Sequence, residues 1–376
     1  MRILQITVHF SPNLGGVETH IDDLISALEK LGHDVFVLTY RPLQTKVDWK
    51  IFEKMGKIRI MRIPWIPGLF YRLLDKPLFE LIYLLPGIFI FAPFMILLFK
   101  PDVLHAHGII AGIVAVFWGK VFGIRSVIST HNIYHVPTSG LYRNFCGWVF
   151  NNADHVLCLS QQSADEIKSI VKEKGKVGVF TSWVDLNKFK AQSSKLKAKQ
   201  DIGWEGKFVV LFVGRLVEEK GILILLEAAK KWNKNITLAV AGTGPLEENI
   251  KHQSSNINNL VYLGKVDNDE LPKYYNAADV TIVPSIHEEG FGRVIPESLA
   301  CGTPVIGSNR GAIPEVLNNS VGKVIDISAK EIKETVEFYY KNKNKLEELA
   351  KNARGHAKKS YSVKNIEKIF ISYKTS

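Results

Sequence analysis

The stretch EGFGRVIPESLACGT, residues 289–303, places two glutamates eight positions apart where a loop is predicted to become a helix. Glu289 lies in the predicted loop, and Glu297 lies on the second turn of a predicted helix that ends at Gly302. Backbone amides at residues 290–292 and the helix dipole attract an anion. Carboxylates beside an anion are poor phosphate ligands but good acceptors for sugar and ribose hydroxyls. The stretch therefore predicts a nucleotide-sugar site.

On either side of this stretch, short apolar runs alternate with helical patterns. Apolar residues recur at helical spacing over residues 17–31, and Gly32 follows where a helix would end. Strands that alternate with helices predict a parallel sheet covered by helices on both faces. The predicted strands are 2–8, 34–39, 57–63, 101–107, 126–130 and 155–160 in the first half, and 208–214, 236–242, 260–264, 279–284, 304–308 and 322–325 in the second.

The alternating pattern restarts after a Lys-rich, weakly periodic segment at residues 187–207. A chain of 376 residues is long enough for two domains of ordinary size. We therefore predict an α/β protein with two doubly wound, Rossmann-like domains, residues 1–182 and 183–357. A C-terminal helix, about residues 358–376, is expected to pack back on the first domain.

Composition limits the compartment and the partners. Three cysteines stand far apart with no Cys-x-x-Cys pair, and the start MRILQITVHF lacks the pattern of a signal peptide, which favours a reducing cytoplasm. The net charge of +11 includes basic runs at residues 41–62 and 341–376. Such runs suit nucleic acid, anionic lipid or water. Because zinc-finger spacing and an aromatic RNA-binding strand are missing, we predict no nucleic-acid partner.

Residues 81–99, LIYLLPGIFIFAPFMILLF, carry no charge over a length that could span a bilayer. Pro86 and Pro93 interrupt the run, and a predicted sheet strand follows at once. Three readings stay open: an in-plane docking element, a buried helix and a true span. The basic run at 41–62 favours docking on an anionic leaflet, so we predict peripheral association with the cytosolic face of a membrane.

Two loops carry candidate phosphate ligands. In HFSPNLGGVETH, Gly15 and Gly16 let the backbone approach a ligand at the start of a helix, although such a pair is as often a simple turn. The loop lacks the three-glycine dinucleotide fingerprint, which argues against NAD. Arg215 and Lys220 follow a predicted strand and could clamp a diphosphate. Taken singly, each of these cations would be read as a solvated surface residue.

Two motifs imitate metal sites. HAHG has metal-like spacing, but we expect His105 and His107 to point to opposite faces of a strand, with no further ligand nearby. Residues 267–269, DND, lie in a polar turn before a predicted helix. We therefore predict no essential metal and no cofactor, with positive charge supplied by Arg215, Lys220 and the helix terminus.

The segments GGVETH, GRLVEEKG and EGFGRVIPESLACGTPVIGSNRGAIPEVL resemble the retaining glycosyltransferases of family 4. The resemblance runs from residue 2 to about residue 325, and residues 64–100 contribute nothing to it. It implies the GT-B architecture, with two Rossmann-like domains facing across a cleft. The Glu-x7-Glu element, Glu289 to Glu297, is its most diagnostic feature. One departure is Ser182-Trp183, which stands where the family usually has Asn-Gly at the domain junction.

The resemblance also implies a role for each matched residue. Arg215 and Lys220 hold the donor diphosphate, Glu297 the ribose and Glu289 the donor sugar. His131 reaches that sugar from the N-terminal domain, although an isolated histidine would be read as a buried, satisfied ring. The implied catalytic residues are His131, Arg215, Lys220 and Glu289. The implied donor-binding residues are Gly15, Gly16, Arg215, Lys220, Glu289, Gly290, Phe291, Gly292 and Glu297.

We therefore predict transfer of a hexose of the mannose, glucose or N-acetylglucosamine type from a UDP- or GDP-sugar. The acceptor is expected to be a lipid-linked or membrane-associated glycan, and the anomeric configuration to be retained. Two alternatives stay open: a nucleotide-sugar epimerase or hydrolase of the same architecture, and a non-catalytic nucleotide-sugar-binding subunit. Base, sugar and acceptor are left open, because base contacts are often made by backbone and sugar choice can depend on one hydroxyl.

Overall fold

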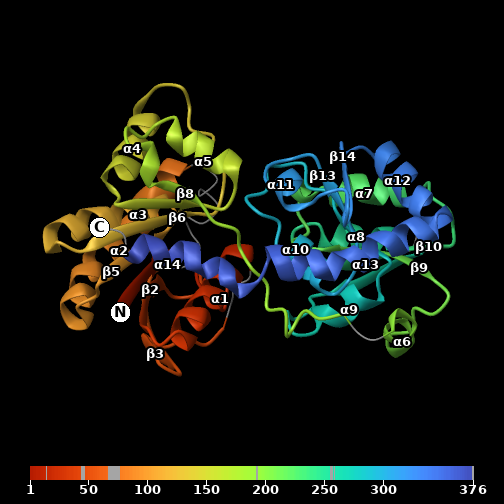
Figure 1. Cartoon of the computed structure of the whole chain (residues 1–376), viewed down its shortest axis with the longest axis horizontal. Coiled ribbons are helices and arrows are strands. Elements are labelled where there is room, and N and C mark those ends of the chain that lie inside the picture. Colours follow the sequence, from red (N-terminus) through yellow and green to blue (C-terminus); the bar gives the residue numbers. More distant parts are fainter. Residues whose placement is uncertain are drawn as a thin grey trace. The chain divides into compact units, whose positions relative to one another are not determined.

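The computed structural model describes residues 1–13, 15–43, 47–66, 77–191, 194–254, 257 and 259–374. The chain divides into two compact units (Figure 1). The first contains Met1–Ser182 together with Lys364–Ser376, and the second contains Trp183–Val363. Leu14 of the glycine loop, residues 44–46 of the basic run and residues 192–193 of the predicted linker lie outside the described residues.

The described residues of the first unit form an eight-stranded sheet. Its strands are β1 (Arg2–Thr7), β2 (Asp34–Tyr40), β3 (Phe52–Met55), β4 (Ile58–Ile63), β5 (Val103–His107), β6 (Arg125–Thr130), β7 (His155–Cys158) and β8 (Val177–Val179). The order is β3-β4-β2-β1-β5-β6-β7-β8, and only the β3–β4 pair is antiparallel among these pairings. The chain direction across the sheet reverses between β1 and β5. This topological switch point is where open α/β sheets bind ligands.

Helices cover both faces of this sheet (Figure 1). They are α1 (Gly16–Lys30), α2 (Pro77–Phe99), α3 (Ile109–Phe122), α4 (Leu141–Asn152), α5 (Gln161–Lys168) and α14 (Ile366–Lys374), with a 3-10 turn at η2 (Lys174–Lys176). A further 3-10 turn, η4 (Val363–Asn365), begins at the last residue of the second unit. The C-terminal helix α14 belongs to this unit although it follows the second unit in sequence. Its Phe370 ring stacks on His33 at 4.8 Å between ring centres, and its Tyr373 is buried.

Helix α2 is apolar around its whole circumference. One side, including Leu84, Ile88 and Ala92, packs into the core of the first unit. The opposite side is exposed, with Phe94 65% and Leu98 72% accessible. By length and composition alone, Phe79–Phe99 could cross a membrane. In this structure the inner side of the helix is part of the sheet-and-helix core of the first unit.

The second unit repeats the same topology with six strands. These are β9 (Phe208–Val213), β10 (Ile236–Ala241), β11 (Leu260–Gly264), β12 (Val280–Val283), β13 (Val305–Ser308) and β14 (Gly322–Ile325). All are parallel in the order β11-β10-β9-β12-β13-β14, so the switch point lies between β9 and β12. The remaining elements are α6 (Lys195–Asp201), η3 (Glu218–Lys220), α7 (Ile222–Ala229), α8 (Glu247–Ser254), α9 (Leu271–Ala277), α10 (Val294–Ala300), α11 (Ile313–Val316), α12 (Ala329–Lys341) and α13 (Lys343–Ser360).

The predicted fold class, two doubly wound α/β units, is confirmed. Strands β11 and β14 have the predicted limits, and the others differ by a residue or two at their ends. The sequence pattern missed β3, which is largely exposed at the sheet edge, and β8, which is three residues long. It also missed α6, a polar helix that lies inside the segment expected to be weakly periodic.

Candidate active site

The candidate donor residues of the second unit share one edge of its sheet. Arg215 and Lys220 follow β9, and Glu289 and Glu297 follow β12. Strands β9 and β12 pair directly, with Leu211 opposite Thr281. The carboxyl ends of adjacent parallel strands lie at the same edge, so these four residues enter from the same side of the switch point.

Hydrogen bonds and close packing join the loops after β9 and β12. The carbonyl of Glu219 accepts from the backbone amide of Ile286 at 2.9 Å and lies 3.0 Å from Nδ1 of His287. Gly221 has φ +71°, and a Cβ there would lie 1.8 Å from the carbonyl oxygen of Pro284. No side chain fits at Gly221, because the two backbones are already in contact. This packing holds Lys220 beside the loop of Glu289.

Lys220 and Glu289 form a direct ion pair between Nζ and Oε1. The same Oε1 accepts a 2.6 Å hydrogen bond from Ser285 Oγ, and Oε2 lies 3.8 Å from Nε2 of His287. Burial by itself would raise the pKa of Glu289, but the charge and hydrogen bond of Lys220, with the Ser285 hydroxyl, outweigh it and lower that pKa. Glu289 is thus a carboxylate at neutral pH. It can accept hydrogen bonds from hydroxyls, and it is poorly suited to donate a proton.

The main chain of Glu289 is fixed from its other side by the loop after β13. The backbone amide of Ala312 donates to the Glu289 carbonyl at 2.8 Å. Gly311 has φ +54°, and a Cβ there would lie 2.5 Å from both the nitrogen and the oxygen of Glu289. A glycine is therefore required at 311 for the loop to approach this closely. The carboxylate is positioned by three separate loops.

Glu297 lies deeper in the second unit. The sequence pattern predicted Glu297 on the second turn of its helix. Helix α10 begins at Val294, however, so Glu297 is in the first turn. The residue is 5% exposed, which agrees with the packed face indicated by its small neighbours. Tyr275 Oη donates to Oε2 at 3.0 Å, and Arg293 Nε lies 3.7 Å from Oε1. These two partners hold the carboxylate in a fixed orientation.

Arg215 contrasts with Lys220 on the same loop. Its side chain is exposed and has no ion pair or hydrogen bond with any described residue. A guanidinium in this state can turn toward a phosphate without breaking an internal bond. Two residues of the turn after Glu289 were also predicted to bind the donor. Gly292 has φ +74°, a conformation that favours glycine. Phe291 is buried, and its ring centre lies 6.0 Å from that of Tyr361.

The glycine loop belongs to the first unit, at the switch-point edge of its sheet. Helix α1 begins at Gly16, and Gly15 precedes it without a side-chain cap. The carboxylate of Glu18 folds back over this start, so a Cβ on Gly15 would lie 2.3 Å from Glu18 Oε2. A carboxylate of the chain itself therefore lies where the sequence predicted an approaching phosphate.

His131 follows β6 in the first unit and is 8% exposed. Burial lowers the pKa of His131 to about 4, so the ring is neutral. Its Nε2 lies 3.0 Å from Nδ1 of His107, whereas its own Nδ1 is buried with no hydrogen-bond partner among the described residues. His131 is therefore a half-satisfied ring.

The predicted orientation of the two histidines in the HAHG motif was wrong. His105 and His107 lie on the same side of β5, with ring centres 4.5 Å apart, because residues two apart on a strand share a face. Their ring nitrogens bond to protein groups: His105 to Tyr373 and Ser129, and His107 to Gln5 and His131. Within the described ranges, no group of three or more residues has the arrangement of a metal site.

Sequence reasoning missed three residues that hold the two glutamates: Ser285, Tyr275 and Arg293. Arg293 precedes Glu297 by four positions, a helical spacing that brings opposite charges together and could have been noticed. Ser285 is a loop residue, and Tyr275 comes from helix α9. Neither position carries a local signal, because only the tertiary packing brings it to the carboxylate.

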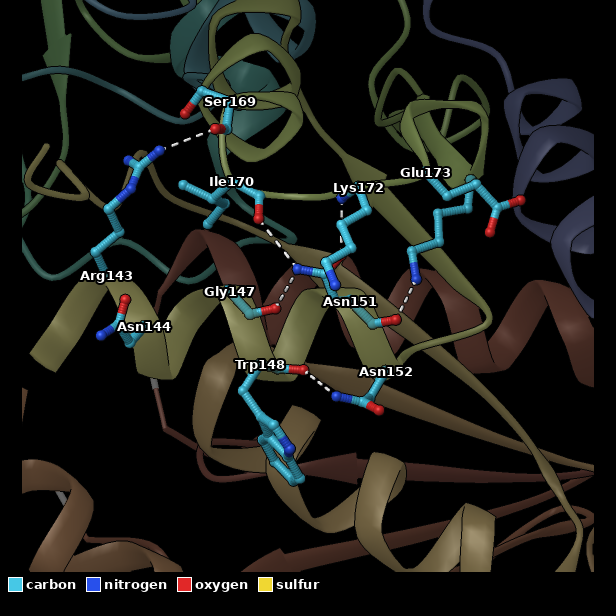
Figure 2. A pocket seen from close by; sticks show the side chains of 11 residues that line it. Arg143, Asn144, Gly147, Trp148, Asn151, Asn152, Ser169, Ile170, Lys172 and Glu173 are labelled. Atoms are coloured by element: carbon cyan, nitrogen blue, oxygen red, sulfur yellow. Dashed lines mark hydrogen bonds between the residues drawn. The ribbon is translucent and has the colours of Figure 1, made fainter. Parts of the chain in front are cut away.

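A cavity of about 720 Å³ opens elsewhere in the first unit, between α4 and the segment after α5. Figure 2 shows that several of its polar groups form hydrogen bonds to the chain itself. Asn151 Nδ2 donates to the carbonyls of Gly147 and Ile170, and Arg143 donates to that of Ser169. Lys176 Nζ donates to the carbonyl of Asn151 at the end of α4. These bonds close the end of a helix and indicate a structural role.

Two family models match successive parts of the chain, from residue 14 to residue 356. A model described as "Glycosyltransferase Family 4" matches residues 14–188, and one described as "Glycosyl transferases group 1" matches residues 194–356. The chain belongs to glycosyltransferase family 4. This family membership agrees with the Glu-x7-Glu element and with the fold of both units.

Similar proteins include two synthases and a protein whose structure contains UDP. An alpha-monoglucosyldiacylglycerol synthase of Streptococcus pneumoniae is 27% identical and aligns over 85% of this chain and 74% of its own length. A sucrose-phosphate synthase of Thermosynechococcus elongatus shares the fold, with TM-score 0.84, 21% identity and 98% of each chain covered. Anabaena Alr3699/HepE in complex with UDP has TM-score 0.78 and 20% identity, over 99% of this chain and 98% of its own. The family 4 chain thus has the GT-B fold.

Proposed function

We propose that this family 4 chain is a retaining hexosyltransferase that uses a UDP- or GDP-sugar and a lipid-linked or membrane-associated glycan acceptor. The observation that carries the proposal is the ion pair of Lys220 with Glu289 at the switch point of the second unit. A cation for the diphosphate and a carboxylate for the sugar meet there, with Arg215 exposed on the same loop. The Anabaena relative whose structure contains UDP supports a nucleotide donor.

The chemistry follows from the charge at this edge. When the bond from the sugar to the diphosphate breaks, negative charge develops on the leaving phosphate. Lys220 and Arg215 stabilise that charge, and no metal ion is needed for it. Glu289 holds sugar hydroxyls as a carboxylate and forms no covalent adduct, and Glu297 accepts from the ribose. Attack from the face that the diphosphate leaves, with a phosphate oxygen taking the acceptor proton, retains the configuration.

A membrane-associated acceptor is supported by the outer side of α2. Ile90, Phe94 and Leu98 are 58%, 65% and 72% exposed, and their spacing of four residues forms one stripe along the helix. On α3, Val121 extends the exposed apolar surface at 58%, and the two helices pack together through Phe89 and Phe117. Isolated exposed apolar residues are ordinary, but a contiguous stripe of this kind is typical of an interaction surface.

Exposed cations lie near the C-terminal end of α2 and on α3. Lys100 follows the end of α2, and the Arg59 guanidinium lies 5.8 Å from the centre of the Phe99 ring. Lys120 is exposed on α3. An exposed apolar stripe on a unit with exposed cations near it in sequence suits the headgroup region of an anionic leaflet, with the helix lying in the plane of the membrane. The inner side of α2 stays in the core of the unit, which favours docking over a span.

The donor is tested by a thermal-shift screen of UDP- and GDP-sugars, with and without EDTA. We expect one nucleotide class to raise the melting temperature, because a ligand that binds only the folded state stabilises it. EDTA should leave that shift unchanged. The glycosyltransferase proposal fails if no nucleotide sugar binds. Sugar release from the bound donor without any acceptor would favour a hydrolase, and binding without turnover on any acceptor would favour a non-catalytic subunit.

Membrane docking is tested by sedimentation with vesicles of phosphatidylcholine, alone or mixed with phosphatidylglycerol. The wild-type chain should bind the anionic vesicles more strongly. A Phe94→Ser/Leu98→Ser double variant should bind them about tenfold or more weakly, because two exposed side chains no longer enter the interface. Phe338→Ser, which removes a 49% exposed phenylalanine from the second unit, is the matched control. Equal binding of all three chains would contradict docking by α2.

A further inference from the structure

A chain of buried hydrogen bonds ends at the unpartnered nitrogen of His131. It starts at Tyr373, a residue of the C-terminal helix α14. The Tyr373 hydroxyl lies 3.4 Å from Gln5 Nε2. Gln5 Oε1 lies 2.8 Å from His107 Nε2, and His107 Nδ1 lies 3.0 Å from His131 Nε2. Gln5, His107 and Tyr373 are all at least nine-tenths buried, at 0%, 6% and 3% exposure. All belong to the first unit.

The positions of the protons follow from the chemistry of each partner. An amide oxygen only accepts, so His107 must carry its proton on Nε2. Burial, with the nearby imidazoles, lowers the pKa of His107 well below its ordinary value, so the ring is neutral and its Nδ1 is a lone pair. That lone pair requires a donor, which is His131 Nε2. A neutral His131 protonated at Nε2 then has a lone pair at Nδ1.

In the structure the Gln5 amide turns its Nε2 toward Tyr373 and its Oε1 toward His107. Tyr373 Oη lies 2.6 Å from His105 Nδ1, and His105 Nε2 lies 2.7 Å from Ser129 Oγ. If the tyrosine donates to His105, its oxygen accepts from the Gln5 NH₂ group, as the contact at 3.4 Å requires. The histidine then donates to the serine hydroxyl. With Gln5 in this orientation, every proton in the network is assigned without conflict.

We propose that Gln5 and His107 are positioning residues that fix His131 in its Nε2-protonated tautomer, so that Nδ1 accepts a hydrogen bond from a hydroxyl of the bound substrate. The part about the substrate rests on the proposed function, and the tautomer does not. The buried Nδ1 of His131 has no partner among the described residues, and a hydroxyl donor is the group that would satisfy it. A carboxylate in that place would meet a lone pair, so a uronic acid is disfavoured there relative to a sugar with a free hydroxyl.

The tautomer can be read directly by long-range ¹H–¹⁵N correlation spectra of the full chain labelled at histidine, without ligand. The His131 signals are assigned by their loss in His131→Gln. We expect wild-type His131 to be protonated at Nε2 and not at Nδ1. Gln5→Leu removes the acceptor and should give His131 as a mixture of tautomers or the Nδ1-protonated form. Gln5→Glu keeps an acceptor oxygen and should preserve the wild-type pattern.

Ser129→Ala is the matched control, because it removes a buried hydrogen bond of His105 and leaves the path from Gln5 to His131 intact. It should not change the His131 tautomer. If Gln5→Leu does not fold, as judged by circular dichroism, Tyr373→Phe replaces it, since it removes the hydroxyl that orients Gln5. Protonation of wild-type His131 at Nδ1, or an unchanged His131 tautomer in folded Gln5→Leu or, in its place, Tyr373→Phe, would overturn the proposal.

A binding measurement then tests the substrate part. With UDP-glucose and UDP as probes, the gain in affinity that the glucose brings should fall about 5- to 10-fold in Gln5→Leu, and UDP binding should be unchanged. If Gln5→Leu has an altered His131 tautomer but UDP-glucose still binds more tightly than UDP by the wild-type factor, the role of Nδ1 is overturned. If neither probe binds the wild type, the glycosyltransferase proposal with a UDP donor is at fault, and the tautomer result stands by itself.

Discussion

The two units have the same sheet order around the switch point, yet they treat polar groups there in opposite ways. The second unit presents charge: Lys220 pairs with the ionised Glu289, and Arg215 is exposed beside them. The first unit presents neutral rings, since burial lowers the pKa of His105 to about 3 and that of His131 to about 4. One fold thus yields a charged edge, for which we propose diphosphate binding, and an edge of neutral, hydrogen-bonded rings, for which we propose contact with hydroxyls.

The largest expected effect concerns the charged edge. Arg215→Ala should reduce kcat/KM about 10²- to 10³-fold, because the developing charge on the leaving diphosphate loses a donor. The melting temperature should not change, since the side chain is exposed and makes no described contact. Lys234→Ala removes an exposed cation from the same unit and should leave turnover as it is. Near-normal turnover of Arg215→Ala would break the distinction between the units.

The neutral edge predicts acid sensitivity. A histidine whose pKa is depressed in the folded state stabilises the fold above its unfolded pKa, about 6.5, and this stability is lost as pH falls toward the folded value. His105→Gln should therefore flatten the loss of unfolding free energy between pH 7 and pH 5 by about 1–2 kcal/mol. Urea denaturation at both values measures this. The exposed His252→Gln is the control, and equal slopes in all three chains would contradict a neutral cluster.

Asp22 extends the comparison, because it is an acidic residue of the first unit whose burial disfavours the charged form. Burial, only partly offset by a hydrogen bond from Ser11, raises the pKa of Asp22 from 3.8 to about 6. The folded state holds this proton more tightly than the unfolded state, so stability is lost as pH rises from about 4 to 6. Asp22→Asn should raise the free energy of unfolding by about 1–2 kcal/mol at pH 8 and by less at pH 5. Exposed Asp48→Asn should change neither, and a destabilised Asp22→Asn would contradict the account.

The smallest effect is expected at Ser285. Ser285→Ala removes one hydrogen bond to Glu289 Oε1 and leaves the Lys220 ion pair. Affinity for the nucleotide sugar should fall about 3- to 10-fold, as one hydrogen bond to a charged group is worth. Ser308→Ala is the matched control, because it removes a buried serine hydroxyl of the same unit that has no hydrogen-bond partner among the described residues. A calorimetric titration in which the two variants are equal would show that Ser285 does not position the carboxylate.

The sequence predicted the charged edge better than the neutral one, for a physical reason. Arg215, Lys220 and Glu289 lie in loops at strand ends, where local pattern and topology together fix the position. The histidine path depends on residues far apart in sequence, such as Gln5 and Tyr373, which only tertiary packing brings together. One error on the neutral edge was avoidable. Residues two apart on a strand share a face, so the sequence alone should have placed His105 and His107 on the same side. Most strands were predictable, whereas the edge strand β3 lacked an apolar pattern.

The central claim is that Arg215 and Lys220 bind the diphosphate, and that Glu289 binds the sugar, at one edge of the sheet in the second unit. Calorimetric titration of the nucleoside diphosphate and of its nucleotide sugar into Arg215→Ala and Glu289→Gln tests it most directly. The account predicts that Arg215→Ala weakens both ligands about tenfold or more, and that Glu289→Gln weakens only the ligand that carries the sugar. Unchanged diphosphate binding in Arg215→Ala, or an equal loss for both ligands in Glu289→Gln, would contradict it.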